Sequence, residues 1–322
     1  MTTVVPVLVY DIALRTRFRG LLRRDGLLVR GDAGWAEFSP FWDYDAAESF
    51  AWWRAAREAA DLGWPAAVRD RIPVNVTVPA VGPEQAHAIV TRSGGCRTAK
   101  VKVAEPGQSL ADEVARLEAV RDAIGPDGAI RVDANAAWDL DTAVARLAAL
   151  DRAAGGLEYA EQPVPTVDDL ARLRRRTHVP IAADESIRRA SDPLAVARAE
   201  AADVVVLKVQ PLGGVRACLE LAERIGLPVV VSSALETSVG LAAGVALAAA
   251  LPELPYACGL ATAQLLTSDV VVDPLLPVDG ALEVRRPVPD ETLLERAAAD
   301  PELAQRWAAR LREVERHGAD QA

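Results

Sequence analysis

The stretch Thr98-Ala99-Lys100-Val101-Lys102-Val103 decides the fold of this chain. Its Val and Thr residues favour a β-strand, in which successive side chains alternate between the two faces. Lys100 and Lys102 therefore point one way, and the apolar residues beside them point the other. If the apolar face packs on helices, both ammonium groups lie inside a sheet or barrel, where they need nearby anions.

Three later strand-like segments end in a carboxylate that can supply these anions. They end at Asp133, Glu161 and Asp184, and a fourth such segment ends at Lys208. The three carboxylates follow one another by about the length of one strand and one helix. Because the carboxyl ends of parallel strands meet at one edge of a sheet, we expect these side chains to converge.

The alternation of strand-like and helical segments after Pro73 predicts an α/β fold. Short Val- and Ile-rich runs alternate with amphipathic helices, which indicates a (β/α)8 barrel over residues 71–275. We expect residues 1–70, joined by residues 276–322, to form a smaller α+β capping domain. The eight expected strands are Pro73–Val78, Ala99–Val103, Ala129–Asp133, Gly156–Glu161, Pro180–Asp184, Ala202–Lys208, Pro228–Ser232 and Tyr256–Gly259.

Both ends of the chain lack the regular alternation of strands and helices that predicts the barrel. Val4 to Leu14 alternates like a strand and leads into a polar loop, Arg15 to Asp25. Gly31-Asp32-Ala33-Gly34 predicts a hairpin turn, and Asp45 to Leu62 predicts a helix. Leu282 to Val284 is expected to be a last strand that returns to the capping domain.

Composition excludes several classes of function. The net charge of −10 argues against nucleic acid as a partner, since phosphate binding needs clustered Lys and Arg. The three cysteines are widely spaced, which suits a reducing cytoplasm and neither a disulfide scaffold nor a zinc site. No signal peptide is evident, and the longest apolar run, Val239 to Leu251, is too short to cross a bilayer. We therefore expect a soluble cytoplasmic protein with no membrane partner; the oligomeric state is not legible.

The convergent side chains predict a metal-assisted reaction. Three carboxylates so close together cannot all stay ionised without a cation, and oxygen ligands favour Mg²⁺ or Mn²⁺ over zinc. Lys102 and Lys208 come from strands on opposite sides of the carboxylates. A partly desolvated lysine beside a cation can act as a base near neutral pH. The arrangement suits removal of a proton next to a substrate carboxylate, through an enediolate.

These residues carry a resemblance to a known family. The Lys-x-Lys pair and Lys208, with Asp133-Ala134-Asn135, Glu161-Gln162-Pro163 and Asp184-Glu185-Ser186, resemble the enolase superfamily, and within it the muconate-lactonizing subgroup, over nearly the whole chain. Two further segments, 34–40 and 232–240, are similar to a dehydratase of that superfamily in menaquinone biosynthesis. The resemblance implies a carbon–oxygen lyase acting on a small carboxylate, 2-succinyl-6-hydroxy-2,4-cyclohexadiene-1-carboxylate.

The resemblance also implies a role for each catalytic and metal-binding side chain. Lys102 would remove the proton and then protonate the departing hydroxyl on the same face. Lys208 would stabilise the opposite face of the ring by a cation–π contact, and Lys100 would orient Lys102. The ligands of Mg²⁺ would be the three carboxylates named above, Asp133, Glu161 and Asp184.

The substrate-binding residues that it implies lie around this centre. Ser232 and Ser233 would hold the succinyl carboxylate with hydroxyl and backbone donors. Asn135 would lie beside the metal ligands, and the loop from Arg15 to Asp25 would close over the mouth of the barrel as a lid.

Other interpretations stay open at this point. The same lysines and metal ligands serve isomerases of this scaffold, which racemise N-acylamino acids or cycloisomerise muconate. Lys208 alone would also fit a Schiff-base aldolase, and a non-catalytic barrel is a further alternative. Mandelate-racemase-like chemistry is disfavoured because no histidine ends a strand. Dipeptide epimerase activity is disfavoured because Gly259-Leu260-Ala261 replaces the Asp-x-Asp that would hold an ammonium group.

Overall fold

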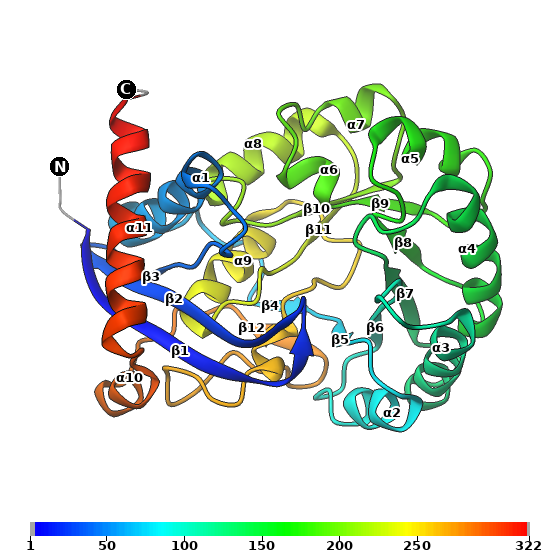
Figure 1. Ribbon diagram of the computed structural model, residues 1–322, viewed down its shortest axis with the longest axis horizontal. Helices are drawn as coiled ribbons and strands as arrows, with labels where there is room; N and C mark the ends of the chain where they lie inside the picture. The colour runs from blue at the N-terminus through cyan, green and yellow to red at the C-terminus, as the bar shows by residue number, and fades with distance from the viewer. Residues whose placement is uncertain (1–3, 321–322) are drawn as a thin grey trace.

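The chain folds into two parts that lie side by side. The computed structural model describes residues 4–320. In Figure 1 one part contains the N-terminal strands and the C-terminal helix, and the other is a curled parallel sheet ringed by helices. The expected α/β barrel with a smaller α+β capping part is confirmed at this level. The exact boundaries at residues 70 and 275 stay a prediction.

The first three strands form an antiparallel sheet in the order β1-β2-β3. They are β1 (Val5–Phe18), β2 (Leu21–Gly31) and β3 (Gly34–Phe38). The hairpin predicted at Gly31-Asp32-Ala33-Gly34 joins β2 to β3, with Gly31 paired to Gly34. Gly34 has a φ of +127°, a conformation that L side chains rarely adopt, which explains the glycine.

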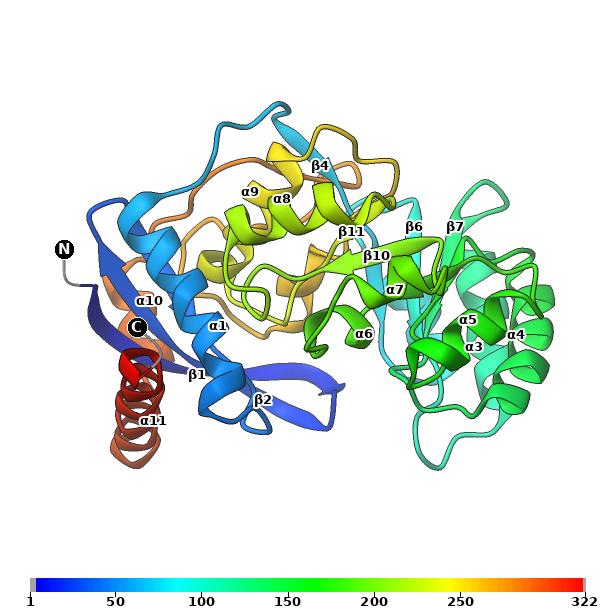
Figure 2. The same ribbon diagram turned by 90° about the horizontal axis from the view of Figure 1, so that it is seen from above.

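The polar loop predicted for Arg15 to Asp25 is wrong, because strands β1 and β2 continue through it. The turn consists only of Arg19 and Gly20, whose φ angles of 52° and 76° suit a two-residue hairpin turn. Phe18 pairs with Leu21 directly beside that turn. The strand predicted to end at Leu14 is therefore four residues too short. Figure 2 shows this hairpin reaching from the capping part toward the barrel.

Helices from both ends of the chain complete the capping part. Helix α1 (Ala46–Arg57) continues into a π-helical turn, η1 (Glu58–Leu62), which confirms the helix predicted there. The C-terminal helices are α10 (Glu291–Ala297) and α11 (Pro301–Asp320). Trp307 of α11 packs edge to face on Phe38, with ring centroids 5.8 Å apart. Figure 1 shows α11 beside β1 and α1.

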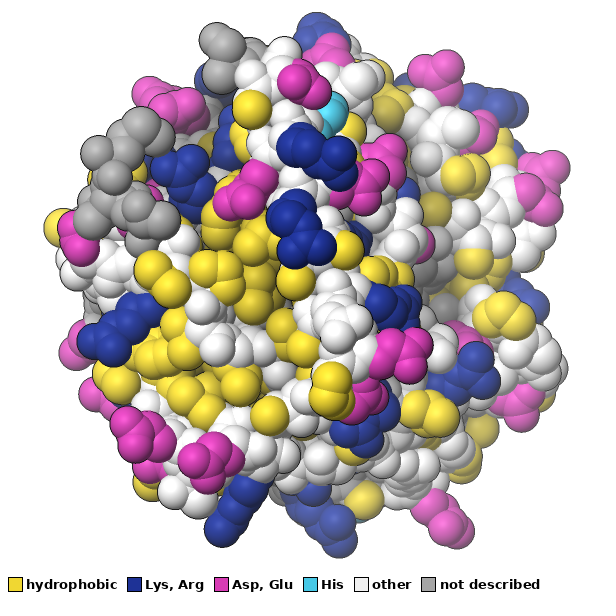
Figure 3. Space-filling model, turned by 60° about the vertical axis from the view of Figure 1, so that its left-hand side comes forward, with side chains coloured by type: hydrophobic (Ala, Val, Ile, Leu, Met, Phe, Trp, Pro, Cys, Tyr) yellow, Lys and Arg dark blue, Asp and Glu magenta, His cyan; other side chains and the backbone are white. Residues whose placement is uncertain are grey.

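Hydrophobic side chains gather on the outer face of the capping part. Figure 3 shows them as a patch bordered by charged side chains, on the side of the molecule where α11 lies. Val5 and Val7 of β1 are 54% and 46% exposed. In Figure 1 this side faces away from the barrel, so it takes no part in the site described below.

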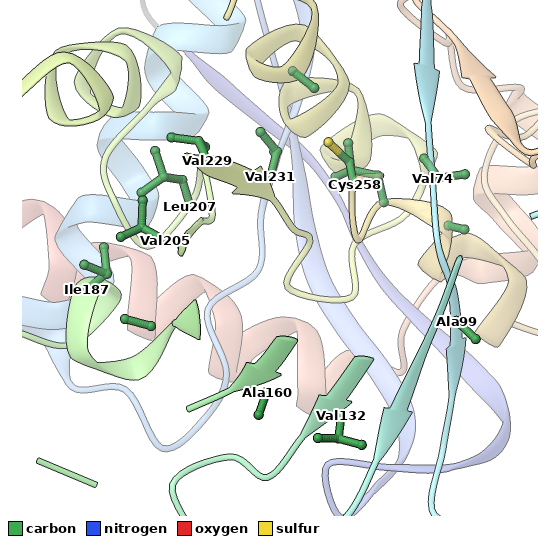
Figure 4. Packing of buried hydrophobic residues seen from close by; sticks show 14 of the residues in the cluster. Val74, Ala99, Val132, Ala160, Ile187, Val205, Leu207, Val229, Val231 and Cys258 are labelled. Atoms are coloured by element: carbon green, nitrogen blue, oxygen red, sulfur yellow. The ribbon is translucent and has the colours of Figure 1, made fainter. Parts of the chain in front are cut away.

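Seven parallel strands form the curled sheet, in the order β11-β10-β9-β8-β7-β6-β5. Their apolar side chains pack outward against helices, as the alternation around Lys100 predicts, and Figure 4 shows Ala99, Val132, Ala160 and Val205 in this packing. The strands are β5 (Val76–Val78), β6 (Thr98–Lys102), β7 (Ala129–Asp133), β8 (Tyr159–Glu161), β9 (Ile181–Ala183), β10 (Val204–Leu207) and β11 (Val229–Val231).

The eighth expected strand, Tyr256–Gly259, is replaced by two isolated parallel bridges. Ser232 bridges Gly259 on one side, and Val74 bridges Cys258 on the other. The backbone N–H of Cys258 donates to Pro73 at 2.7 Å, and that of Gly259 donates to Val231 at 2.8 Å. The short segment therefore joins both edges of the sheet and closes the barrel.

Helices follow the parallel strands and cover their outer face. Helix α9 is almost entirely buried and touches β3, which explains its run of apolar residues. Ser109 caps α3, because its side chain accepts a hydrogen bond from the backbone N–H of Asp112. The helices are α2 (Pro83–Thr91), α3 (Leu110–Ile124), α4 (Leu140–Ala154), α5 (Val167–Arg174), α6 (Glu185–Arg188), α7 (Ala195–Arg198), α8 (Val215–Ile225), α9 (Ser238–Ala250) and the 3₁₀ turn η2 (Ala261–Leu265).

The last strand does not return to the capping sheet. Strand β12 (Ala281–Glu283) pairs antiparallel with β4 (Arg71–Pro73), which lies just before the first barrel strand. The expected partner of Leu282 to Val284 was therefore wrong. Leu282 is fully buried against Ile72, so this small ribbon anchors the chain beside the barrel before it enters the C-terminal helices.

Candidate active site at the mouth of the barrel

Three predicted carboxylates meet at the carboxyl ends of neighbouring strands. Asp133 ends β7, Glu161 ends β8, and the two residues are direct partners across the sheet. Asp184 follows β9 by one residue. Each side chain is at most 1% exposed. Parallel pairing in register is what brings them together, since it aligns the strand ends at one edge.

The three predicted lysines face these carboxylates from the flanking strands. Lys102 Nζ lies 2.5 Å from Asp133 Oδ2, and Lys100 Nζ lies 2.8 Å from Glu161 Oε2. On the other side, Lys208 Nζ lies 2.6 Å from Asp184 Oδ2. All six charged groups predicted from the sequence are therefore in one buried cluster, which we call the mouth cluster.

Burial and neighbouring charges shift the pKa values of the mouth carboxylates in different directions. Burial, with the charge of Asp133 next, raises the pKa of Glu161 to about 7. Burial acts to raise the pKa of Asp133 as well, but Lys102 and Lys100 outweigh it and hold that pKa well below its usual range. Arg188 and Lys208 do the same for the pKa of Asp184.

The buried lysines also differ from each other. Burial lowers the pKa of Lys208, and the Asp184 carboxylate offsets only part of that effect. Burial acts in the same direction on Lys100, but Glu161 and Asp133 outweigh it, so the pKa of Lys100 rises. The lowered lysine pKa expected from the sequence for a lysine that flanks the carboxylates is therefore met at Lys208.

The donor chemistry of the mouth cluster fits a hard divalent cation. Its three carboxylates offer oxygen atoms only, as Mg²⁺ prefers. In the arrangement described for residues 4–320, each carboxylate points to an ammonium or guanidinium group, and no three acidic, histidine or cysteine side chains are gathered closely enough to hold an ion as they lie.

A second ring of side chains, which the sequence analysis did not assign, orients the ligands. Arg188 Nε donates to Asp184 Oδ1 at 3.0 Å, and its other nitrogens reach Glu185 and the hydroxyl of Tyr44 from the capping part. Gln162 Oε1 accepts the backbone N–H of Asp184 at 3.0 Å. Arg188 lies one helical turn after Asp184, and this spacing could have identified it.

Asn135 lies within the mouth cluster, as predicted. Its Oδ1 accepts a hydrogen bond from Lys102 Nζ at 2.7 Å, and its backbone N–H donates to Asp133 Oδ1 at 3.1 Å. Its Nδ2 donates to Glu185 at 3.2 Å. Asn135 thus orients Lys102 in this arrangement, and whether it also touches substrate stays a prediction.

A cavity over the mouth cluster brings the predicted substrate-binding residues to the lysines. Ser232, Ser233 and Asn135 line it together with all three lysines and Asp133, whereas Glu161 and Asp184 do not. Ser233 Oγ lies 2.5 Å from Thr262 Oγ1. Phe18 and Arg19, from the segment predicted to cover the mouth, line it as well. The remaining lining residues, to which the sequence analysis gave no role, are Thr77, Ala234, Leu235, Gly259 and Thr262.

The tip of the β1–β2 hairpin covers this cavity. Phe18 is buried, and Lys102 Nζ lies 5.5 Å from the centre of its ring. Phe18 and Arg19 also line the next cavity outward, which shares Lys102 and Asn135 with the first. The cover predicted over the mouth is therefore present as a hairpin tip rather than a loop, and its movement stays a prediction.

A larger cavity of about 580 Å³ lies outside the mouth. It is lined by α2 and by residues 261–276, and it shares only Thr77 with the cavity over the lysines. None of the mouth cluster lines it. Size alone would favour this cavity, but the convergent charged groups make the mouth the candidate active site.

Comparison with known proteins identifies the family of this chain. Residues 83–290 match the model described as enolase C-terminal domain-like, and residues 9–60 match the enolase N-terminal domain-like model. The chain belongs to the enolase superfamily. Within it, the chain is 68% identical to the o-succinylbenzoate synthase of Thermobifida fusca, over 94% of this chain and 93% of that protein. Its identity to the o-succinylbenzoate synthase of Mycobacterium tuberculosis (strain ATCC 25618 / H37Rv) is 53%, over 94% and 92%.

Solved structures of the superfamily share the fold. The muconate lactonizing enzyme of Pseudomonas fluorescens aligns with a TM-score of 0.79 over 92% of this chain and 98% of that one, at 22% identity. The L-Ala-D/L-Glu epimerase of Bacillus subtilis aligns with a TM-score of 0.75, over 90% and 97%, at 22% identity. The expected grouping with o-succinylbenzoate synthases, which are lyases, is confirmed by the closer relatives. No helix in residues 4–320 is both long and apolar enough to cross a membrane.

Proposed function

We propose that this chain dehydrates 2-succinyl-6-hydroxy-2,4-cyclohexadiene-1-carboxylate to 2-succinylbenzoate, the o-succinylbenzoate synthase step of menaquinone biosynthesis. The observation that carries the proposal is the mouth cluster, in which Lys102 and Lys208 lie on opposite sides of three buried carboxylates. The identity of 68% to an o-succinylbenzoate synthase supports this choice of substrate.

Lys102 is the proposed acid and base of the reaction. It lies on the cavity wall beside Asn135, which accepts a hydrogen bond from its ammonium group. As the free amine, Lys102 removes the proton from the carbon that bears the ring carboxylate. The resulting ammonium group then protonates the departing hydroxyl on the same face, so water leaves and the ring becomes aromatic.

Lys208 and Lys100 act by charge rather than by proton transfer in this proposal. Lys208 lines the opposite wall of the cavity, and its ammonium group faces the ring as the π system forms. Lys100 lies beneath Lys102 on the same strand face, where its contacts with Glu161 and Asp133 hold it in place. This contact keeps Lys100 charged and steers Lys102 toward the substrate.

The residues that would hold a metal are Asp133, Glu161 and Asp184. Mg²⁺, or Mn²⁺ in its place, would supply positive charge that offsets the developing enediolate when bound. Arg188 and Gln162 hold Asp184 in position from behind, through its side chain and its backbone N–H. These contacts keep the acceptor oxygens ordered before substrate arrives.

Ser232 and Ser233 are the proposed contacts for the succinyl carboxylate. Both follow β11, the seventh barrel strand, and line the cavity together with Lys102. Ser233 shares a hydrogen bond with Thr262, so its hydroxyl is oriented before substrate binds.

The cytoplasmic location of the protein, which was inferred from its cysteine content, also stays a prediction.

A panel of substrates tests the proposal. The purified protein with Mg²⁺ should aromatise the succinyl-hydroxycyclohexadiene carboxylate, measured as ultraviolet absorbance, and should turn over N-acylamino acids and muconate slowly or not at all. Racemisation of N-acylamino acids or cycloisomerisation of muconate, with no dehydration, would move the function to an isomerase. No metal-dependent turnover of any of the three would favour a non-catalytic barrel.

A further inference from the structure

A buried arginine of the capping part makes the contact on which this inference rests. Arg24 lies on β2, is 1% exposed, and stacks over the ring of Phe41 at 4.5 Å. Its Nη1 donates to the carbonyl of Asp25 at 2.8 Å, and its Nη2 donates to that of Ser39. These contacts fix the guanidinium group within the capping part.

The same guanidinium group also contacts backbone carbonyls of the barrel. Arg24 Nε donates to the carbonyl of Leu235 at 3.0 Å, and Nη2 lies 3.5 Å from the carbonyl of Ala234. Ala234 and Leu235 line the substrate cavity directly after Ser233. Arg24 itself does not line the cavity, so it can act on substrate only through this wall.

The wall that Arg24 holds has a strained backbone. Leu235 has a φ of +66°, a left-handed conformation that costs a branched residue free energy unless its surroundings impose it. Leu235 is only 2% exposed. The Arg24 hydrogen bond to its carbonyl is an interaction that a relaxed loop would lose.

A second contact from the capping part holds the next residues of the wall. Glu37 of β3 accepts hydrogen bonds from the backbone N–H of Thr237 at 3.1 Å and from its hydroxyl at 2.6 Å. A Cβ added to Gly240 would lie 2.8 Å from the Glu37 carboxylate, which shows how closely Glu37 fits the start of α9. The wall is thus held at both ends by the capping part.

We propose that Arg24 is a positioning residue for substrate binding. It holds the Ala234–Leu235 carbonyls and so fixes the cavity wall that follows Ser232 and Ser233. This inference rests on the proposed function, because the wall matters only if those serines bind the succinyl carboxylate. Loss of Arg24 should therefore weaken substrate binding more than it slows the chemical step, since Lys102 and Lys208 are untouched.

The kinetic test compares Arg24→Ala with Arg286→Ala in the Mg²⁺-loaded full-length protein. Arg286 is a matched control because it also donates to three capping-part carbonyls, of Ala33, Trp35 and Ala59, but does not reach the wall. We expect Arg24→Ala to raise KM at least about tenfold with kcat within about threefold of wild type. Arg286→Ala should keep the wild-type KM, and Arg24→Lys should lie between wild type and Arg24→Ala.

Two results would overturn the inference. One is a wild-type KM in folded Arg24→Ala, and the other is an equal rise of KM in Arg286→Ala. If Arg24→Ala does not fold, Arg24→Lys decides alone: a KM raised about threefold supports the inference, and a wild-type KM overturns it.

Hydrogen exchange separates this inference from the proposed function. The amides of residues 232–237 should exchange faster in Arg24→Ala than in wild type, and not in Arg286→Ala. If wild type does not dehydrate the substrate, the proposed function fails, while faster exchange of these amides would still support the structural role of Arg24. Unchanged exchange with normal wild-type turnover would overturn that role alone.

Discussion

The interior of the barrel contains two buried charged layers with different properties. The mouth cluster lies at the carboxyl ends of the strands. A second group, which we call the lower cluster, is centred two residues earlier on the same strands, further inside the barrel. Arg131 precedes Asp133 by two residues on β7, and Tyr159 precedes Glu161 by two on β8. The lower cluster consists of Arg131 with Asn75, Glu158, Tyr159 and Tyr256.

The lower cluster is built around one cation with fixed partners. Arg131 is fully buried, its Nε donates to Glu158, and its Nη1 donates to the carbonyl of Ala257 at 2.7 Å. The guanidinium carbon lies 4.6 Å from the centre of the Tyr159 ring. These contacts place Arg131 across the closing segment of the barrel, which is a structural role.

The mouth cluster instead holds several like charges together. Three carboxylates compete for three lysines and Arg188, so their pKa values are pushed apart. Arg131 in the lower cluster has no competing cation among its named partners, and its Nε and Nη1 each donate to one or two fixed acceptors. The comparison teaches that burial of charge alone does not mark a site, and that competition among like charges does.

Removal of the proposed base should have the largest effect on activity. Lys102→Ala should lower kcat by about 1,000-fold or more, because the acid and the base of the reaction are lost together. The melting temperature should stay close to that of wild type. The measurement is the steady-state dehydration rate, and a variant that keeps more than a tenth of wild-type kcat would rule out this role.

Loss of a proposed metal ligand should change metal dependence as well as rate. Asp184→Asn removes one anionic oxygen, leaves Lys208 without its carboxylate partner and leaves Arg188 paired only with Glu185. We expect the Mg²⁺ concentration for half-maximal rate to rise by about tenfold or more. A Mg²⁺ titration of the dehydration rate measures this, and an unchanged midpoint would remove Asp184 from the ligand set.

The lower cluster should respond in the opposite way, through stability. Arg131→Met leaves Glu158 without its cation and should lower the free energy of unfolding by about 3 kcal/mol, the low end for a buried pair because Glu158 is 26% exposed. Per folded molecule, kcat should match wild type. Denaturant unfolding measures the free energy of unfolding, and the dehydration rate divided by the concentration of folded protein measures kcat. A large loss of kcat with normal stability would make the lower cluster part of the active site.

A buried carboxylate outside both clusters, Glu236, is expected to affect the pH dependence of stability, which is a smaller effect than those above. Burial, with the charge of Glu37 next, raises the pKa of Glu236 from 4.5 to about 7. The folded state therefore retains this proton to higher pH than the unfolded state, so its contribution to stability falls as pH rises from about 4.5 to about 7.

Glu236→Gln should remove that part of the pH dependence. The unfolding midpoint in urea, measured at intervals between pH 5 and pH 7.5, should fall less steeply in the variant than in wild type. Ser109→Ala, a change of a helix cap far from Glu236, serves as a control that lowers stability without altering the slope. Equal slopes in wild type and Glu236→Gln would contradict the raised pKa.

The sequence was enough to predict the charged groups of the mouth cluster, but few of the side chains that hold them or the surrounding walls in place. Period-two alternation placed Lys100 and Lys102 on one face, and the strand-plus-helix spacing aligned the three carboxylates. Arg24 and Arg131 could not be assigned in this way, because their partners are backbone carbonyls or residues brought near only by folding. Arg188 was missed although its spacing of one helical turn from Asp184 could have identified it. The hairpin turn at Arg19-Gly20 was missed since an arginine in the left-handed region carries no strong sequence signal.

The rate of dehydration after removal and return of metal tests the central claim most directly. The purified protein should turn over 2-succinyl-6-hydroxy-2,4-cyclohexadiene-1-carboxylate with Mg²⁺, lose that activity in EDTA, and regain it along a saturable curve when Mg²⁺ is added back. Full recovery would support carboxylates that hold a cation between two lysines. An undiminished rate in excess EDTA would contradict the account, since the three buried carboxylates would then have no catalytic ion to hold.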